Sequence, residues 1–285
     1  MNSHRSSPGL RRKGVPFPWA LLRFWVMRSL PTWLAVALPI HLFQIAICVI
    51  LRDNDFVRAL LLFSQSLPPF LQRVLSSAGL QGGDLVSLIS VGYVHPLVLV
   101  LFMAYAVAVP TGLLVGELES GSMELILSRA VTRTQVFVCA AIPTVAGMFL
   151  LTQVMFLGTL AGAALAGFEE PLPLAGFYQL SLNGGLLAVT AATMALFVSA
   201  FSRERGTAVG LTLAYLVFDY LLNIVSTWWP PLAQLQPFSL FHYINSREVL
   251  TQPGWPVDDM VVLGVVALTA LALGWIVWRR RDLPV

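Results

Sequence analysis

The sequence predicts an all-helical protein that crosses a membrane about six times. Of its residues 57% are hydrophobic and only 11% are charged, against roughly 45–50% and about 25% in soluble domains. The mean hydropathy is +0.79. Several apolar runs approach or exceed the about 20 residues that a helix needs to cross the hydrocarbon of a bilayer. Because charged or Pro/Gly-rich segments separate these runs, we expect a polytopic membrane protein.

Six apolar runs are long enough to form the spans, and we expect them at residues 31–51, 94–115, 136–166, 176–201, 207–228 and 260–278. The third run is longer than one bilayer thickness, so it must tilt, kink at Pro143 or protrude. Residues 85–115 are almost continuously apolar, which leaves open a short extra helix before Pro96. Residues 31–285 are therefore expected to form one six-span domain.

The segments outside these spans also have expected structures. The N-terminal stretch FPWALLRFWVMRSL combines Trp and Leu with two arginines, which is typical of a helix lying at the inner membrane surface. An ordinary basic leader over residues 1–30 is the alternative. Two outer segments, 52–93 and 229–259, are too long for simple turns. We expect amphipathic helices at the outer surface in the first and a partly re-entrant helical element in the second.

The placement of basic residues predicts that both termini are cytosolic. If the N-terminus is inside, four of the 17 Lys and Arg residues fall in outer segments, namely Arg52, Arg58, Arg73 and Arg247. All the others fall in inner segments: Arg5, Arg11, Arg12, Lys13, Arg23, Arg28, Arg129, Arg133, Arg203, Arg205, Arg279, Arg280 and Arg281. Cytosolic loops of membrane proteins carry such an excess of positive charge.

A polar stripe follows one face of the fifth span. Its members are spaced by three or four residues, as one helix face requires: Thr212, Tyr215, Asp219, Asn223 and Ser226. Asp219 lies about 20 Å from the start of the span, where a lone carboxylate costs about 2.5 kcal/mol or more. The stripe must therefore face protein or water. It either lines a path, with Asp219 as a proton-linked carboxylate, or makes a hydrogen-bonded helix or subunit contact.

Two other patterns predict helix packing. His41, Gln44 and Cys48 share one face of the first span, where helix packing is favoured over a metal site. Gly158 and Gly162 in the third span have the four-residue spacing of a close helix contact.

A short cytosolic segment concentrates charge between the second and third spans, with Glu117, Glu119, Glu124, Arg129 and Arg133. Four residues in it have the spacing of one apolar helix face: Met123, Ile126, Leu127 and Ala130. Thr132 and Gln135 are spaced as a capping box that would start the third span. The glutamates match an anionic inner leaflet poorly. We expect a short amphipathic helix that either contacts a protein partner or lies in a solvated loop.

The sequence also argues against several activities. It contains no Gly-x-x-x-x-Gly-Lys-Ser/Thr phosphate loop, so it does not bind and hydrolyse ATP by that route. Glu169 and Glu170 lack the following arginine of a paired-glutamate protease and are expected in a solvated turn. Cys48 and Cys139 fall near opposite membrane faces, which argues against a disulfide. We therefore expect a chain that is not an enzyme.

At the charged segment the sequence resembles the membrane subunits of type-2 ABC transporters, which are export permeases of six spans. The matching residues are Glu117, Glu119, Gly121, Ser122, Glu124, Leu125, Ser128, Val131, Thr132 and Arg133. Ala130 stands where the family usually has proline. The stretch PFSLFHYINSREVL before the last span and RRRDL after it are similar to the closing segments of the same family.

This resemblance implies that residues 117–133 hold a coupling helix that docks on a separate ATPase subunit. The residues it assigns to coupling are Glu117, Glu119, Gly121, Met123, Glu124, Ile126, Leu127, Arg129 and Arg133. It further implies an N-terminal elbow helix, a second permease subunit that is identical or homologous, and two ATPase copies carrying ATP and Mg²⁺. This chain itself would hold no cofactor and no nucleic acid. Such a complex would export its substrate through a bacterial inner membrane.

Two other classes of function remain open. An ATP-independent secondary carrier would use Asp219 and depend on an ion gradient. A membrane scaffold or assembly factor would have no transport role.

Overall fold

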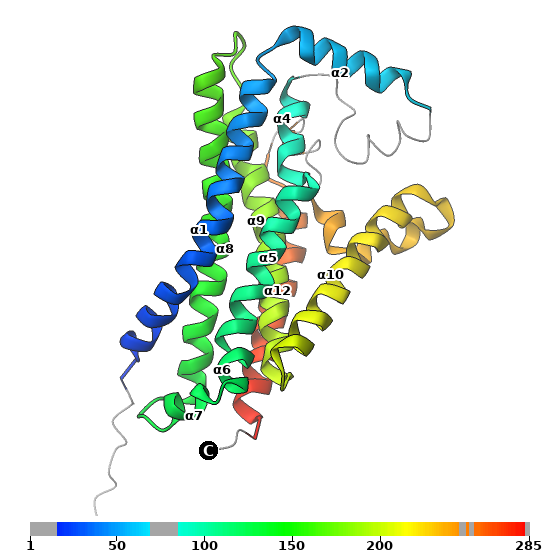
Figure 1. Cartoon of the computed structure of the whole chain (residues 1–285). Coiled ribbons are helices and arrows are strands. Elements are labelled where there is room, and N and C mark those ends of the chain that lie inside the picture. Colours follow the sequence, from blue (N-terminus) through cyan, green and yellow to red (C-terminus); the bar gives the residue numbers. More distant parts are fainter. Residues whose placement is uncertain (1–15, 69–84, 245–248, 251–253, 283–285) are drawn as a thin grey trace, which may run out of the picture.

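Six long apolar helices run side by side in the computed structural model, which describes residues 16–68, 85–244, 249–250 and 254–282 (Figure 1). They come from α1 (Trp19–Ile50), α4 (Leu85–Val94) with α5 (Pro96–Leu113), α8 (Arg133–Ala166), α9 (Leu174–Phe201), α10 (Arg205–Trp228) and α12 (Val257–Arg280). The described ranges contain helices and no strand. The all-α, six-span prediction is thereby confirmed. Of the predicted outer and leader segments, residues 1–15, 69–84, 245–248 and 251–253 lie outside the described ranges.

The first span begins earlier than predicted. The stretch expected as a separate interfacial helix is continuous with the span, so that α1 runs from Trp19 through Pro31 and Pro39. A proline removes a single backbone donor, which a membrane helix tolerates when neighbouring helices support it. Trp25 and Ser29, which precede Pro31 in α1, are buried. Packing against the bundle therefore maintains the helix before Pro31. The structure therefore has no helix break between residues 30 and 31, where the sequence predicts a boundary between an interfacial helix and the first span.

The second span is divided into two helices. The short extra helix that the sequence left open before Pro96 is therefore present as α4. Proline disfavours helical backbone in the residue that precedes it, and His95 accordingly has an extended conformation with φ −63° and ψ 135°. Its Nδ1 accepts a hydrogen bond from the Leu97 backbone N–H at 3.2 Å. His95 thus ends α4 and caps the start of α5.

The two ends of the bundle carry different short elements. At one end lie α6 (Val115–Glu119) and α7 (Ser122–Leu127), together with the start of α1 and the end of α12 (Figure 1). We call this the α7 end. At the opposite end, α2 (Asn54–Ser66) lies across the bundle, capped by Asp53, which accepts from the Asp55 N–H at 3.0 Å. This is the helix predicted for the first outer segment.

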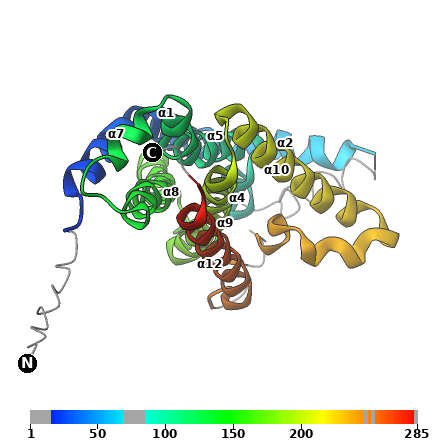
Figure 2. The same cartoon turned by 90° about the horizontal axis from the view of Figure 1, so that it is seen from below.

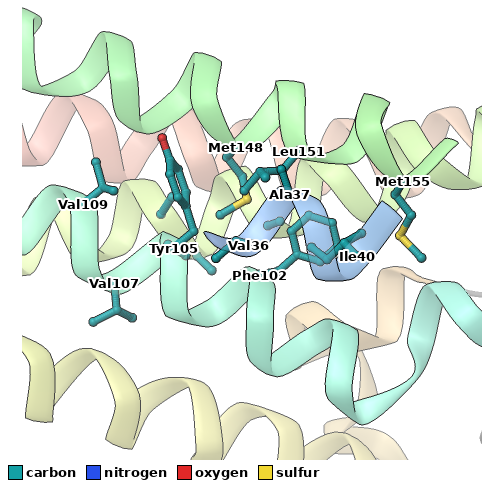
Figure 3. Close-up of a cluster of buried hydrophobic side chains, with 14 of the residues drawn as sticks. Val36, Ala37, Ile40, Phe102, Tyr105, Val107, Val109, Met148, Leu151 and Met155 are labelled. Atoms are coloured by element: carbon teal, nitrogen blue, oxygen red, sulfur yellow. The ribbon is translucent and has the colours of Figure 1, made fainter. Parts of the chain in front are cut away.

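The core lies where α1, α5 and α8 meet (Figure 3). Ile40, Tyr105, Met148 and Leu151 are almost completely buried there. The Tyr105 hydroxyl donates to the Pro143 carbonyl at 2.9 Å, so this polar atom is satisfied within the packed region. In lipid, close packing and hydrogen bonds between helices provide much of the stability, because apolar surface gains little by leaving hydrocarbon.

Glycines bring α1 and α8 close together. A Cβ added at Gly158 would lie 2.9 Å from the His41 carbonyl oxygen, and one at Gly162 would lie 2.7 Å from the Cys48 Cβ. The His41 ring Nδ1 lies 3.1 Å from the Val154 carbonyl oxygen. The face with His41 and Cys48 therefore packs on the glycine face. Within the described ranges no group of His, Cys, Asp and Glu is arranged to hold a metal.

We expect Gly162→Ala to destabilise the protein by about 1–3 kcal/mol, because the added methyl group would force α1 away from α8. Gly210→Ala is the matched control, because no atom lies within 4 Å of a Cβ at that glycine. There alanine should be neutral or stabilising by up to about 1 kcal/mol. Thermal unfolding in detergent micelles measures both effects. Equal melting temperatures for the two variants would contradict the close contact.

Candidate functional site

The charged segment forms two short helices at the α7 end instead of one. After α5 the chain continues as α6, turns at Gly121 and forms α7. Gly121 has φ 75°, a left-handed conformation that glycine adopts without steric cost. Helix α7 ends at Leu127, so Ala130 lies beyond it. The capping box is confirmed, because Thr132 Oγ1 accepts from the Gln135 N–H at 3.2 Å and Gln135 Oε1 accepts from the Thr132 N–H at 2.9 Å.

The predicted apolar face of α7 points into the chain's own bundle. Met123 is 1% exposed, and Ile126 and Leu127 are partly buried against the core cluster. The expectation that Met123 is free to contact a partner is therefore wrong. The spacing identified the apolar face correctly, but it could not show that α6 and the core would cover that face.

The outward surface of α7 instead presents a leucine among polar residues. Leu125 is 72% exposed, and Glu124, Ser128 and Arg129 are exposed around it. We call these four residues the α7 surface. Leu125 belongs to the matched motif but not to the predicted apolar face. Its position on the polar side of α7 was the sequence signal that could have identified it.

Glu117 is buried and connects the charged segment to α1. It is 3% exposed and forms an ion pair with Arg28, which is 51% exposed. The other carboxylate oxygen accepts from the Ser122 hydroxyl, and the Ser120 hydroxyl donates to the Glu117 carbonyl at 3.2 Å. A buried carboxylate requires such partners. Glu117 therefore holds α6 and α7 against α1 and does not face outward.

Glu119 connects the same segment to α10. Its Oε2 accepts from the Arg205 backbone N–H at 2.7 Å. The first N–H groups of a helix have no partner within the helix, and Glu204, the residue preceding α10, provides no side-chain cap. Glu119 thus caps α10 from another helix. Its negative charge also suits the positive end of the helix dipole.

Arg133 connects the start of α8 to the end of α12. Its Nη1 donates to the Arg281 carbonyl, and the Trp278 indole N–H donates to the Arg133 carbonyl at 3.0 Å. Arg281 in turn donates to the Ala200 carbonyl of α9 at 3.0 Å. The pKa of Arg281 is lowered mainly by burial, and the positive charge of Arg203 lowers it further. Of the predicted coupling arginines, Arg129 is exposed and Arg133 is engaged within the chain.

A cleft of about 870 Å³ adjoins the links made by Glu117 and Glu119. It lies between α5 and α10 beside α6, and its polar lining includes Arg28, Glu119 and Arg205. Gly112 and Gly116 also line it. The start of α10 is therefore held to α6 by a hydrogen bond at the border of an open space.

The polar stripe of α10 does not converge on one site. Thr212 and Ser226 donate to carbonyl groups of their own helix, Ala208 at 2.8 Å and Asn223 at 3.1 Å. Tyr215 is exposed. The stripe therefore contains several local contacts rather than a continuous set of facing groups.

Asp219 holds the second outer segment against α10. This segment contains η1 (Pro230–Phe238) and η2 (Leu240–Tyr243). Asp219 is 3% exposed, and its two carboxylate oxygens accept from the Leu240 N–H at 3.2 and 3.1 Å. The Ser239 hydroxyl donates to the Asp219 carbonyl at 3.1 Å. The geometry favours the packing alternative over a carboxylate that lines a path.

We expect Asp219→Ala to destabilise the fold by about 1–3 kcal/mol, because the buried Leu240 N–H would lose its acceptor. Asp219→Asn keeps a carbonyl acceptor and should lose less. Thermal unfolding and protease sensitivity of residues 230–243 measure the effect. An Asn variant with normal stability but no transport would instead support the carrier.

Glu169 and Glu170 are exposed in the turn between α8 and α9, as predicted for a solvated turn. The turn between α8 and α9 lies at the end of the bundle opposite α7 (Figure 1).

Six spans with a short charged turn at one end and a folded-back helical segment near the other define a polytopic helical membrane protein. Residues 26–283 match the family model described as ABC-2 family transporter protein. The chain therefore belongs to this family and is a multi-pass permease of an ABC transporter. Members of the family are membrane subunits that are generally not catalytic. A search among curated proteins gave no match.

Proposed function

We propose that the chain is the membrane permease of an ABC exporter and is driven by a separate ATPase subunit that docks on the α7 surface. The observation that supports this most is Leu125, an exposed leucine ringed by charged and polar groups on a short helix anchored to the bundle. Apolar anchors with charged surroundings are typical of protein interfaces. Family membership implies an ABC ATPase as the general kind of partner.

Movement of the ATPase would be transmitted to the membrane spans through one ion pair and one hydrogen bond. The Glu117–Arg28 ion pair joins the charged segment to α1, and the Glu119–Arg205 hydrogen bond joins it to α10. A displacement of α7 would therefore act on α1 and α10 together. The cleft beside α6 leaves room for α10 to move, as rigid-body motions of packed helices require.

The orientation and partners follow from the same proposal. The α7 end faces the cytosol, and the first and last described helices both have their free ends there (Figure 1). Basic residues at this end agree with a cytosolic position in a bacterial inner membrane: Arg129, Arg133, Arg279, Arg280 and Arg281. ATP and Mg²⁺ bind to the ATPase, present in two copies, and this chain needs no cofactor.

A second permease subunit, identical or homologous, would complete the translocation path. Helix α10 leans away from the other helices (Figures 1 and 2) and exposes large apolar side chains, among them Val217, Phe218 and Leu221. The adjoining cleft carries Arg28 and Arg205, and charged groups in membrane proteins face protein or water. This side of the bundle is therefore suited to a partner subunit.

Affinity purification from native membranes in mild detergent tests the proposed function. We expect an ABC ATPase to co-purify with the tagged chain, and the complex to hydrolyse ATP. Inactivation of ATP hydrolysis in that partner should stop export. A secondary carrier would instead depend on an ion gradient and on Asp219, and a scaffold would show neither dependence. Isolation of the chain with no ATPase would contradict the proposal.

The orientation gives a separate prediction. A cysteine at Glu170 should react with a membrane-impermeant maleimide in intact cells, whereas a cysteine at Ser128 should react only after the cells are opened. Both positions are exposed. The native Cys48 and Cys139 are buried, so the parent chain serves as the low-labelling control. The reverse labelling pattern would overturn the orientation.

A further inference from the structure

An apolar groove follows the bundle between α8, α9 and α12 and has a volume of about 930 Å³. Figure 2 shows these three helices grouped together. Along α8 the lining extends from Thr134 to Phe149, which is roughly 22 Å of helix. One leaflet contributes half of a hydrocarbon core of about 30 Å. The groove is therefore long enough for an acyl chain that starts at one membrane surface.

The α7 end of this groove is polar and basic. The Trp275 indole N–H donates to Thr134 Oγ1 at 3.2 Å, and both residues line the groove. The Arg279 guanidinium carbon lies 5.7 Å from the centre of the Trp275 ring, and Arg280, the following residue, is exposed. Asp282 is the exposed acidic neighbour. Tryptophan with adjacent arginine is typical of the interface between hydrocarbon and headgroups.

The shape of the groove favours a lipid chain over another helix. Small residues, including Ala141 and Ala272, line it, whereas Ile142, Phe149 and Leu268 are large and exposed beside them. Close helix contacts in membranes need small residues on the surface that meets the partner. The large side chains keep a helix at a distance, but a flexible chain fits between them.

We propose that this groove binds one anionic phospholipid from the leaflet at the α7 end. One of its acyl chains lies between α8 and α12, and its phosphate lies beside Arg279 and Arg280. Basic groups near the membrane surface attract anionic lipids. The site goes beyond the proposed transport function, because helices other than the α5–α10 pair form it. Lipid binding and ATPase docking can therefore fail independently.

Native mass spectrometry of the purified full chain tests this site with phosphatidylglycerol and phosphatidylcholine as probes. We expect the wild-type chain to retain phosphatidylglycerol in preference to phosphatidylcholine. The double change Arg279→Gln with Arg280→Gln should lower phosphatidylglycerol retention about tenfold, because the headgroup loses its charge partners. The double change Ala141→Phe with Ala272→Phe should reduce retention of both lipids by filling the groove.

Control variants place the same kinds of substitution elsewhere in the chain. The pair Arg52→Gln with Arg58→Gln removes two exposed arginines at the opposite end, and Ala214→Phe adds bulk at an exposed position on α10. Both should retain lipid as the wild type does. If the filled groove prevents folding, the arginine pair, which leaves the groove intact, decides the question.

Two results would overturn the proposal. If the wild type and all variants retain both lipids equally, the bound lipid is ordinary bilayer lipid and the groove is not a specific site. Loss of self-association in the filled variant, with lipid retention unchanged, would show that the groove is a contact between copies of the chain.

Discussion

Replacing Leu125 with aspartate is expected to lower the amount of ATPase that co-purifies with the chain by about thirtyfold, with the membrane fold intact. Leu125 is 72% exposed, so its replacement leaves the core packing unchanged. Loss of a central apolar anchor from an interface costs about 2 kcal/mol or more, which corresponds to roughly a thirtyfold change in affinity. Quantitative mass spectrometry of the purified complex measures the ATPase, and thermal unfolding measures the fold.

Met123→Ser is the matched control on the opposite face of α7. Met123 is almost completely buried, so serine there should destabilise the fold by about 2–5 kcal/mol through the cavity it leaves. The two variants thus separate docking from stability. If Leu125→Asp retains the ATPase at the wild-type level, the α7 surface is not the docking surface.

Arg28→Ala should have the second large effect, because it leaves the buried Glu117 carboxylate without its cationic partner. Unpaired buried polar groups cost about 1–3 kcal/mol, and half exposure of Arg28 keeps the loss within that range. The additional change Glu117→Gln removes the unpaired charge and should recover part of the stability. Unfolding of the single and double variants gives their coupling energy.

The same variant tests transmission as well as stability. Arg28→Ala leaves the α7 surface unchanged, so the ATPase should still co-purify while export falls. Arg58→Ala, at an exposed position on α2, should change neither quantity. Additive losses from Arg28→Ala and Glu117→Gln would contradict a coupled pair.

Much of the fold could be predicted because lipid imposes length and composition on each span. The apolar runs indicated the six spans, Pro96 indicated the division between α4 and α5, and Thr132 with Gln135 indicated the start of α8. Gly158 and Gly162 indicated a close helix contact, and the structure shows that α1 makes it. Each of these features has a signal in a few residues that are close together in the sequence.

The start of α1 could not be predicted in the same way. Arg23 and Arg28 lower the local hydropathy, so the expected span began at Pro31. The helix already begins at Trp19, before Pro31, because Trp25 and Ser29 pack against the bundle. That support comes from residues distant in sequence, which hydropathy does not detect.

For the candidate site, the sequence indicated the charged segment but not the contacts that its residues make within the chain. Periodicity placed Met123 on an apolar face without showing which neighbours cover it. The acidic residues Glu117 and Glu119 were expected at a partner contact, yet their partners in the chain are Arg28 and the N–H of Arg205. These pairs join residues from different helices, and the sequence alone does not indicate them.

The most direct test of ATPase docking at α7 is photo-crosslinking in native membranes. A photoreactive amino acid at Leu125 should crosslink to an ABC ATPase identified by mass spectrometry. The same group at Leu157, an exposed position on α8 within the apolar part of the bundle, should not. Crosslinks from Leu125 to the ATPase are the predicted result, and crosslinks only to lipid or to other copies of this chain would contradict it.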